Sequence, residues 1–222
     1  MAKLILNAVT KYILGLLMVA LLLFLPAGTL QYQNGWLFIC LLFGPMLLLM
    51  LVMLVKAPDL LQKRLNTKER ESTQKKVVGF SALEFLAGFL LCGLDHRFGW
   101  SHMPLPVVIL ASVLLLLSYG LYALVMRQNA YLSRTIEVQE GQQVIDTGLY
   151  GIVRHPMYAV TTLLFWVIPL VLGSWFGFLV FLPYPLLLVR RIRNEEAVLA
   201  AGLPGYTDYM KKVKYRLIPF VW

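Results

Sequence analysis

The polar residues whose types and spacing could do chemistry lie in two clusters, one on each side of a long apolar segment. The first cluster, from Gly148 to Tyr158, holds an arginine, a histidine and two tyrosines. The second, from Arg190 to Glu196, holds three arginines and two glutamates. If the apolar segment folds back on itself, the two clusters meet at one face of a membrane. Charged groups that converge in this way can form a pocket for a polar, charged ligand.

Each of these residues also has an ordinary structural interpretation. Arg154 and the neighbouring tyrosines suit an interfacial anchor. Pro156 suits the first turn of a helix, because the N–H that it lacks would have no partner there. Arg191 and Glu195 are i,i+4 partners on a helix, and an exposed pair of this kind contributes little to stability. The pairing of the two clusters across one segment favours a binding site.

The elements that must position these clusters are membrane helices. Of the 222 residues, 59% are hydrophobic and only 14% are charged, which is more apolar surface than a soluble domain of this size can hide. Cys40 and Cys92 lie in apolar runs and are expected to be packing residues. The sequence predicts one all-α integral membrane domain over 1–222, with four N-terminal spans in 1–126. The apolar runs are Tyr12–Leu25, Trp36–Val55, Val77–Leu94, Leu105–Met126 and Met157–Val189.

The last run is too long for one span, and we expect a helical hairpin with short or kinked arms. Pro169, Gly173 and Ser174 lie at its middle, and Pro183 and Pro185 interrupt its second half. The distribution of basic residues favours the same topology. With both termini cytoplasmic, nineteen of the twenty lysines and arginines fall on the cytoplasmic side. The net charge of +9 is thus explained by lysines and arginines that flank the membrane spans, and nucleic-acid binding is not expected.

Three shorter expectations concern the loops and the chain start. Lys3 and Lys11 before the first run also fit a signal peptide, but we expect a retained span. Residues 56–76 form a basic connector, in which a surface helix is one option. Residues 134–138 and 143–145 flank Glu140-Gly141 as a short β-hairpin, and residues 194–213 are expected to be helical with a break at Gly202–Gly205.

The spacing of the polar residues resembles that of the isoprenylcysteine carboxyl methyltransferase family and the related phospholipid methyltransferases. The resemblance extends over about residues 145–219. It is carried by Tyr150, Arg154-His155-Pro156, Tyr158, Glu195-Glu196, Tyr206, Tyr209 and Arg216-Leu-Ile-Pro219.

The resemblance implies a membrane enzyme that transfers a methyl group from S-adenosylmethionine to a lipid-like or prenylated acceptor. Residues 127–222 would form the cofactor-binding region, with a small cytosolic cap. Arg154, Arg191 and Glu196 would be catalytic, with either arginine facing the acceptor or the cofactor carboxylate. The cofactor would contact the loop Tyr150–Tyr158, with His155 and Pro156, together with Glu195 or Glu196, and Tyr206 and Tyr209 would close over it.

The residue types leave the acceptor open. A carboxylate acceptor is already ionised and needs only orientation, which an arginine can provide. An amine or thiol must first lose a proton, and His155 or a glutamate could take it. We expect carboxylate O-methylation, with phospholipid, amine or thiol methylation as alternatives. An NADPH-dependent sterol-type reductase and a non-enzymatic transporter or assembly factor are the competing classes, and no oligomeric state is predicted.

Two further polar signals lie elsewhere. Glu84 is a carboxylate within the third run, where ionisable residues are often functional, although it could also pair with Lys75 or Lys76. Asp95-His96-Arg97 with His102 resembles part of a metal site, but its spacing is loose. We therefore expect no metal.

Overall fold

The chain folds into a bundle of helices, several of them long enough to cross a bilayer. The computed structural model describes residues 2–65, 72–133, 136 and 138–222. Five segments of the described chain are apolar and long enough to span: Ala2–Ala27, Gln33–Lys56, Val77–Phe98, Leu105–Gln128 and Trp175–Gly202. The protein is thus a multi-pass membrane protein. Its helices are α1 (Ala2–Ala27), α2 (Gln33–Lys56), α3 (Pro58–Leu65), α4 (Ser72–Phe98), α5 (Leu105–Gln128), α6 (Pro156–Val171), α7 (Trp175–Phe181), α8 (Tyr184–Gly202) and α9 (Tyr206–Lys212), with a 3₁₀ turn at Gly148–Gly151.

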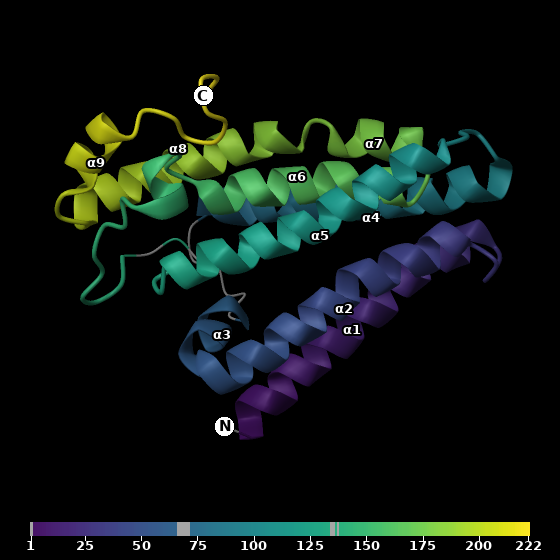
Figure 1. Ribbon diagram of the computed structural model, residues 1–222, viewed down its shortest axis with the longest axis horizontal. Coiled ribbons are helices and arrows are strands. Elements are labelled where there is room, and N and C mark those ends of the chain that lie inside the picture. The colour runs from purple at the N-terminus through teal and green to yellow at the C-terminus, as the bar shows by residue number, and fades with distance from the viewer. Residues whose placement is uncertain (1, 66–71, 134–135, 137) are drawn as a thin grey trace.

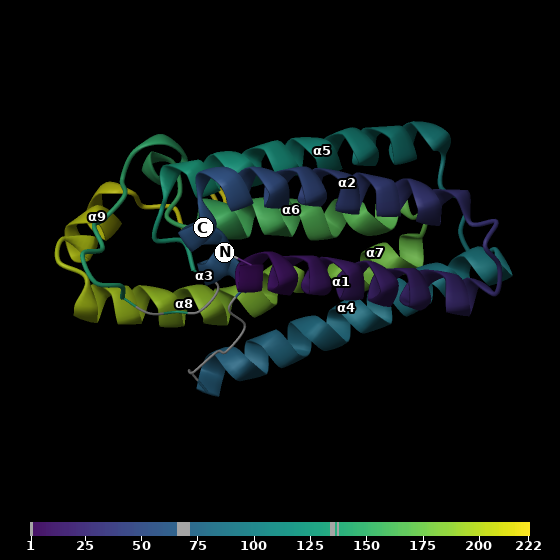
Figure 2. The ribbon, with the colours of Figure 1, turned by 90° about the horizontal axis from the view of Figure 1, so that it is seen from below.

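The long helices run roughly along one axis, and α1 and α2 form a pair that crosses the others at an angle (Figure 1). The pairs α5–α6 and α1–α4 pack extensively. Figure 2 shows α4 diverging from the bundle toward the end that carries α8 and α9. Both termini lie toward this end, which we call the site end. Helices α1, α2, α4 and α5 correspond to the four predicted N-terminal spans, which are thereby confirmed.

The fifth apolar run forms the predicted hairpin. Helix α6 spans 16 residues and ends at a turn in which Gly173 has a φ of +81°, a backbone conformation that L side chains rarely adopt. Ser174 caps α7 by accepting a hydrogen bond from the N–H of Gly177. The return arm breaks at Pro183 and continues as α8, so that α8 comes back to the site end beside the start of α6 (Figure 1).

At the opposite end of the bundle, the buried carboxylate of Asp95 connects three segments by hydrogen bonds. Asp95 of α4 is 2% exposed and accepts hydrogen bonds from the N–H and hydroxyl of Ser101 and from the hydroxyl of Ser174, the last at 2.5 Å. It therefore joins α4 to the loop before α5 and to the turn of the hairpin. The described residues contain no group of three metal-binding side chains, and Asp95 has a structural partner for both of its oxygens.

The core between these ends is packed closely and is largely aromatic. Phe38, Phe89 and Phe181 are fully buried there, and Cys92 packs among them, as expected, whereas Cys40 is exposed. Gly88 lies directly against the Phe181 ring. Because a Cβ at this position would overlap the ring, α4 and α7 approach each other closely only with glycine there.

The connector between α5 and α6 and the segment from α9 onward cover the site end. The β-hairpin predicted across Glu140-Gly141 is not formed by the described residues of the connector, which have no strand; residues 134, 135 and 137 lie outside that description. Gly141 instead lies in a turn, and its carbonyl accepts a hydrogen bond from Tyr131. The predicted break between two helices at Gly202–Gly205 is confirmed, and the connector at 56–76 contains α3.

Candidate functional site

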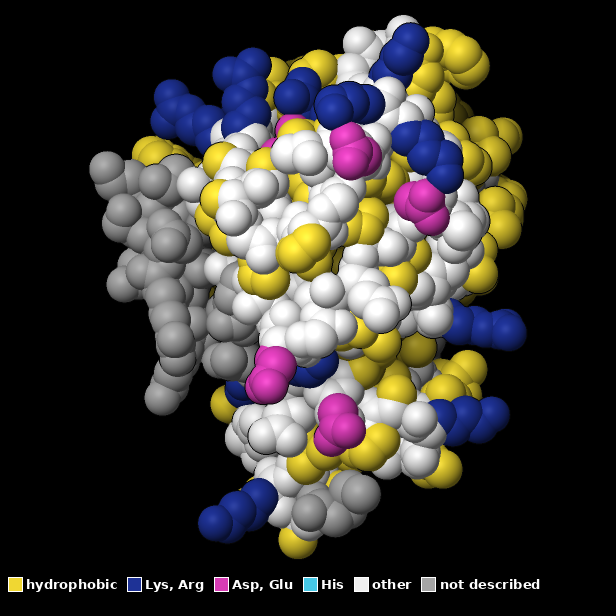
Figure 3. Space-filling view, turned by 90° about the vertical axis from the view of Figure 1, so that its left-hand side faces the viewer, with side chains coloured by type: hydrophobic (Ala, Val, Ile, Leu, Met, Phe, Trp, Pro, Cys, Tyr) yellow, Lys and Arg dark blue, Asp and Glu magenta, His cyan; other side chains and the backbone are white. Residues whose placement is uncertain are grey.

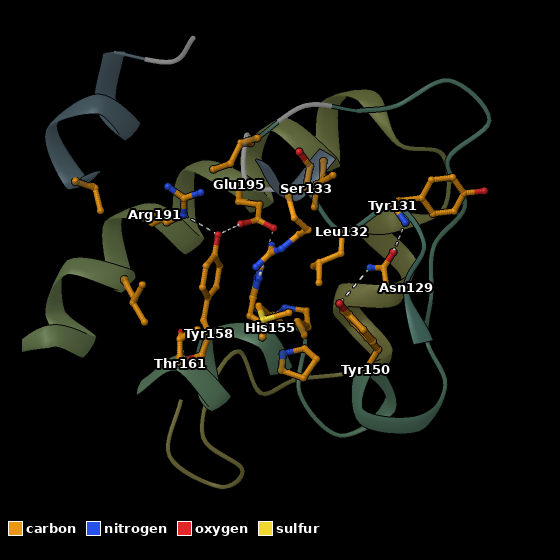
Figure 4. Close-up of a pocket in the computed structure, with 18 of the residues that line it drawn as sticks. Asn129, Tyr131, Leu132, Ser133, Tyr150, His155, Tyr158, Thr161, Arg191 and Glu195 are labelled. Atoms are coloured by element: carbon orange, nitrogen blue, oxygen red, sulfur yellow. Dashed lines mark hydrogen bonds and ion pairs between the residues drawn. The ribbon is translucent and has the colours of Figure 1, made fainter. Parts of the chain in front are cut away.

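A large cavity opens at the site end, where the two polar clusters meet. Its volume is about 730 Å³, within the range of small-molecule binding sites. Its polar part is formed by the connector between α5 and α6, the beginning of α6, α8 and α9. Helix α4 forms a largely apolar wall. Figure 4 shows Tyr158, His155 and Glu195 lying close together in it, with Tyr150, Asn129 and Tyr131 to one side.

Tyr158 connects the two clusters across the hairpin. Its hydroxyl donates a hydrogen bond of 2.5 Å to Glu195 Oε2 and accepts one of 2.8 Å from Arg191 Nε (Figure 4). The predicted i,i+4 partners Arg191 and Glu195 are thus bridged by a tyrosine from α6. His155 stacks beside the Tyr158 ring and places Nδ1 3.9 Å from Glu195 Oε1. A carboxylate, an imidazole, a phenol and a guanidinium therefore converge on one wall of the cavity.

A second group of charges is centred on Glu196, which lies beneath this wall. Glu196 is buried and receives Arg154 Nε at 2.7 Å on Oε1 and Arg216 Nε at 2.8 Å on Oε2. His155 Nε2 lies 3.3 Å from Glu196 Oε1. Buried charges that are paired and hydrogen-bonded on several sides hold their neighbours in place. This group fixes His155 between the two glutamates.

The C-terminal segment supplies the other partners of Arg154. Its Nη1 donates to the carbonyls of Val213 and Lys214 at 2.5 and 3.0 Å. The backbone N–H groups of Arg154 and His155 donate to the carbonyls of Tyr215 and Arg216, each at 2.9 Å. The chain after α9 is therefore bound to the loop before α6 by both side chain and backbone.

Three buried tyrosines close the cavity: Tyr206 and Tyr209 from α9, and Tyr150 from the 3₁₀ turn. Tyr209 donates a 2.7 Å hydrogen bond to the carbonyl of Tyr150, and its ring packs against Tyr206. Burial raises the pKa of Tyr150 to about 12 and raises the pKa of Tyr206 and Tyr209 further. These phenols stay protonated at neutral pH, so they serve as donors and packing surfaces rather than as bases.

The structure brings nearly all of the sequence-predicted site residues to the cavity. Of the described residues, those that line it include Tyr150, Arg154, His155, Pro156, Tyr158, Arg191, Glu195, Tyr206 and Tyr209. Glu196 is not among the lining residues and lies beneath the wall instead. The basic residues Arg190 and Arg193 are exposed.

Other lining residues were missed by the sequence analysis. Asn129 follows the end of α5 and donates a 3.1 Å hydrogen bond to the Tyr150 hydroxyl, and Arg64 comes from α3, far away in the sequence. The change from apolar to polar residues after α5 is the one signal that could have indicated Asn129. No comparable change in the sequence around Arg64 indicates that this residue lines the cavity. Glu84 lies outside the cavity wall, and its two buried oxygens have no hydrogen-bond partner among the described residues.

Fold and site together define a class: an all-helical, multi-pass membrane protein with a charged small-molecule cavity at one end of the bundle. Comparison with known proteins refines this class. The sequence model of the phospholipid methyltransferase family matches residues 106–203, which span α5, the connector and the hairpin. The predicted resemblance to this superfamily of membrane methyltransferases is thereby confirmed.

A reductase also resembles part of the chain. Delta(14)-sterol reductase of Mus musculus is 34% identical over 91 residues, which are 40% of this chain. The match spans only 22% of the reductase, so this similarity concerns a shared region and not the whole protein.

Proposed function

We propose that the protein is an S-adenosylmethionine-dependent methyltransferase that acts on a lipid-like acceptor within the membrane. One observation carries the proposal: Tyr158, Glu195, Arg191 and His155 converge on one cavity, and all four lie in the stretch that matches a methyltransferase family.

The residues of the cavity suit this cofactor chemically. S-adenosylmethionine carries hydroxyl and amino donors, a carboxylate and an adenine ring. Glu195 offers carboxylate oxygens to the donors, and an arginine can bind the carboxylate. Tyr206 and Tyr209 offer buried aromatic faces for the ring. Glu195 is the better candidate of the two glutamates, because it lines the cavity.

When bound, the cofactor would supply a methyl group that is activated on a sulfonium. The protein would then hold an acceptor in line with that methyl group and exclude water. Arg191 would orient the acceptor, with Tyr158 fixing the guanidinium by accepting its Nε–H. Arg154, which lines the cavity, and Glu196, which lies beneath the wall, would act as positioning residues, because their charges pair with each other. Carboxylate O-methylation needs no base and is our first choice, with amine, phospholipid or thiol methylation as alternatives.

We further propose that the site end faces the cytoplasm, so that both termini are cytoplasmic. Lys and Arg side chains are spread around the rim of this end (Figure 3), as expected for a cytoplasmic face. The cover formed by the connector, α9 and the following segment would then be the small cytosolic cap.

An NADPH-dependent reductase is the second candidate, and the partial match to Delta(14)-sterol reductase favours it. Calorimetry on detergent-purified protein separates the two. S-adenosylmethionine and S-adenosylhomocysteine should bind with micromolar affinity, whereas NADPH should not. Tight binding of NADPH alone would establish the reductase instead. Binding of none of the three to folded protein would remove both candidates.

A further inference from the structure

The loop Arg216–Trp222, which follows α9, presents an exposed apolar tip that the proposed cofactor site does not use. The tip consists of residues 218–221, and its sequence, Ile-Pro-Phe-Val, is apolar throughout. Phe220 and Val221 are 88% and 75% exposed, and Ile218 is 40% exposed. Apolar surface of this kind is stabilised when another apolar phase takes the place of water.

Hydrogen bonds within the loop hold the tip in place. The carbonyl of Trp222 accepts hydrogen bonds from the N–H groups of Arg216 and Leu217, each at 2.9 Å. It also accepts one of 3.1 Å from the N–H of Ile218, and the N–H of Trp222 donates back to the carbonyl of Ile218 at 3.1 Å. Phe220 has a φ of +65°, a left-handed conformation that costs free energy for a residue other than glycine. The exposed phenyl ring is therefore presented by a closed loop and not by a free tail.

This loop packs against the hairpin at the level where α8 changes from apolar to charged residues. The change falls between Val189 and Arg190. Trp222 packs against a buried cluster that includes Leu188 and Ile192, which lie on either side of it. Such a change in a spanning helix marks the boundary between membrane and water. Figure 1 shows the C-terminus beside the hairpin, near the level at which α6 begins, whereas α9 lies farther out.

The residue types around the tip are those found at membrane interfaces. Trp222 is partly buried, and the guanidinium of Arg216 lies 5.3 Å from the centre of its ring. Lys214, just before the loop, is exposed. Tryptophan rings favour the level of the lipid headgroups, and lysine and arginine side chains can extend to the phosphates. The loop thus combines a basic part that suits headgroups with an apolar tip that suits acyl chains.

We propose that the loop Arg216–Trp222 is an interfacial anchor, whose tip enters the boundary between headgroups and acyl chains in the leaflet at the site end. Helices that lie in this boundary bury their apolar side chains by about 5–10 Å, and the same depth is expected for Phe220. The anchor is joined to the site, because the N–H of His155 donates to the carbonyl of Arg216, whose side chain binds Glu196 at 2.8 Å. Contact with the bilayer therefore orients the wall that carries His155 relative to the membrane surface.

The test places an environment-sensitive fluorophore at the tip of the full chain, in nanodiscs of phosphatidylcholine and phosphatidylglycerol. Cys40 is replaced by alanine, Cys92 is buried, and Val221→Cys carries the label. Asp208→Cys, at an exposed position of α9, is the matched control. A nitroxide lipid labelled near its headgroup should quench the label at Val221→Cys at least about threefold more than the label at Asp208→Cys. Iodide in the aqueous phase should show the reverse preference.

A second pair of variants tests whether the apolar side chain holds the tip in the membrane. In the chain labelled at Val221→Cys, Phe220→Ser should reduce quenching by the nitroxide lipid at least about twofold, because the largest apolar contact is lost. Phe220→Leu should keep most of the quenching. Because Phe220 is exposed, neither change should unfold the protein, and thermal unfolding of both variants verifies this.

Three outcomes would overturn the proposal. One is equal quenching by the nitroxide lipid of the labels at Val221→Cys and Asp208→Cys. Another is equal quenching in the Phe220→Ser and Phe220→Leu variants. The third is self-quenching of the label at Val221→Cys that rises with the protein-to-lipid ratio in vesicles of the same lipids, which would show that a second copy of the chain covers the tip.

Discussion

The guanidinium of Arg154 and the carboxylate of Glu196 form a buried ion pair, with 2.7 Å between Nε and Oε1 and side chains only 5% and 7% exposed. Glu196→Gln should lower the free energy of unfolding by about 3 kcal/mol, because removing one charge leaves its buried partners uncompensated. Denaturant titration in detergent measures this change. Asp208→Asn, which affects only an exposed pair with Lys211, is the control and should have little effect. A stable Glu196→Gln protein that fails to bind cofactor would instead indicate a direct contact.

Glu195 should have the opposite profile. Glu195→Gln removes the charge that faces the cavity, so we expect about a tenfold loss of S-adenosylmethionine affinity with a nearly unchanged free energy of unfolding. Calorimetry and denaturant titration on the same protein separate the two effects. Tyr158→Phe, which removes only the hydroxyl between Glu195 and Arg191, should cause a smaller loss. Wild-type affinity in both variants would argue against this wall as the cofactor site.

The contact between α4 and α7 should not tolerate a larger residue at Gly88. Gly88→Ala places a methyl group against the fully buried Phe181 ring, and overpacking of this kind costs about 1–3 kcal/mol. Gly44→Ala in α2, where an added Cβ meets nothing within 4 Å, is the matched control and should be neutral or slightly stabilising. Thermal unfolding followed by intrinsic fluorescence compares the two. If Gly88→Ala is as stable as Gly44→Ala, the helices are less closely packed than described.

The proposed orientation can be tested with single cysteines. In a Cys40→Ala background, in which Cys92 is retained because it is buried, Asp208→Cys reports on the site end and His102→Cys on the opposite end. A membrane-impermeant maleimide should label Asp208→Cys only in inside-out vesicles and His102→Cys only in right-side-out vesicles. The reverse pattern would place the cavity on the outer face and contradict the orientation.

The membrane architecture could be predicted from the sequence because its causes are local. Runs of apolar residues set the spans, and Gly173 and Ser174 marked the turn of the hairpin. The positive-inside rule, applied to the basic residues as an expectation, also favoured this hairpin. The meeting of Tyr158 with Glu195 and Arg191 followed from this hairpin, since it returns α8 to the beginning of α6.

Contacts between distant segments could not be predicted in this way. Arg64 lines the cavity from α3, where its guanidinium contacts Tyr122 of α5, and no periodicity in the sequence indicates that contact. The burial of Glu196 and the exposure of Glu195 to the cavity depend on the rotation of α8, about which two adjacent glutamates give no information. The β-hairpin expected around Glu140 stays a prediction for residues 134, 135 and 137, which lie outside the described residues; the described part of this connector has no strand, and there the Tyr131 hydroxyl donates a hydrogen bond to the Gly141 carbonyl.

The bonds from Arg154 to the carbonyls of Val213 and Lys214 have a consequence for biogenesis. Spans that are synthesised early can insert and pack one after another, but the loop before α6 must wait for its partners until the chain beyond α9 has left the ribosome. Until then the Arg154 guanidinium has Glu196 but lacks its two carbonyl acceptors, and the loop that carries His155 lacks its backbone partners in the C-terminal segment. The cavity therefore matures last, and a nascent chain should acquire ligand-binding competence in one late step rather than gradually.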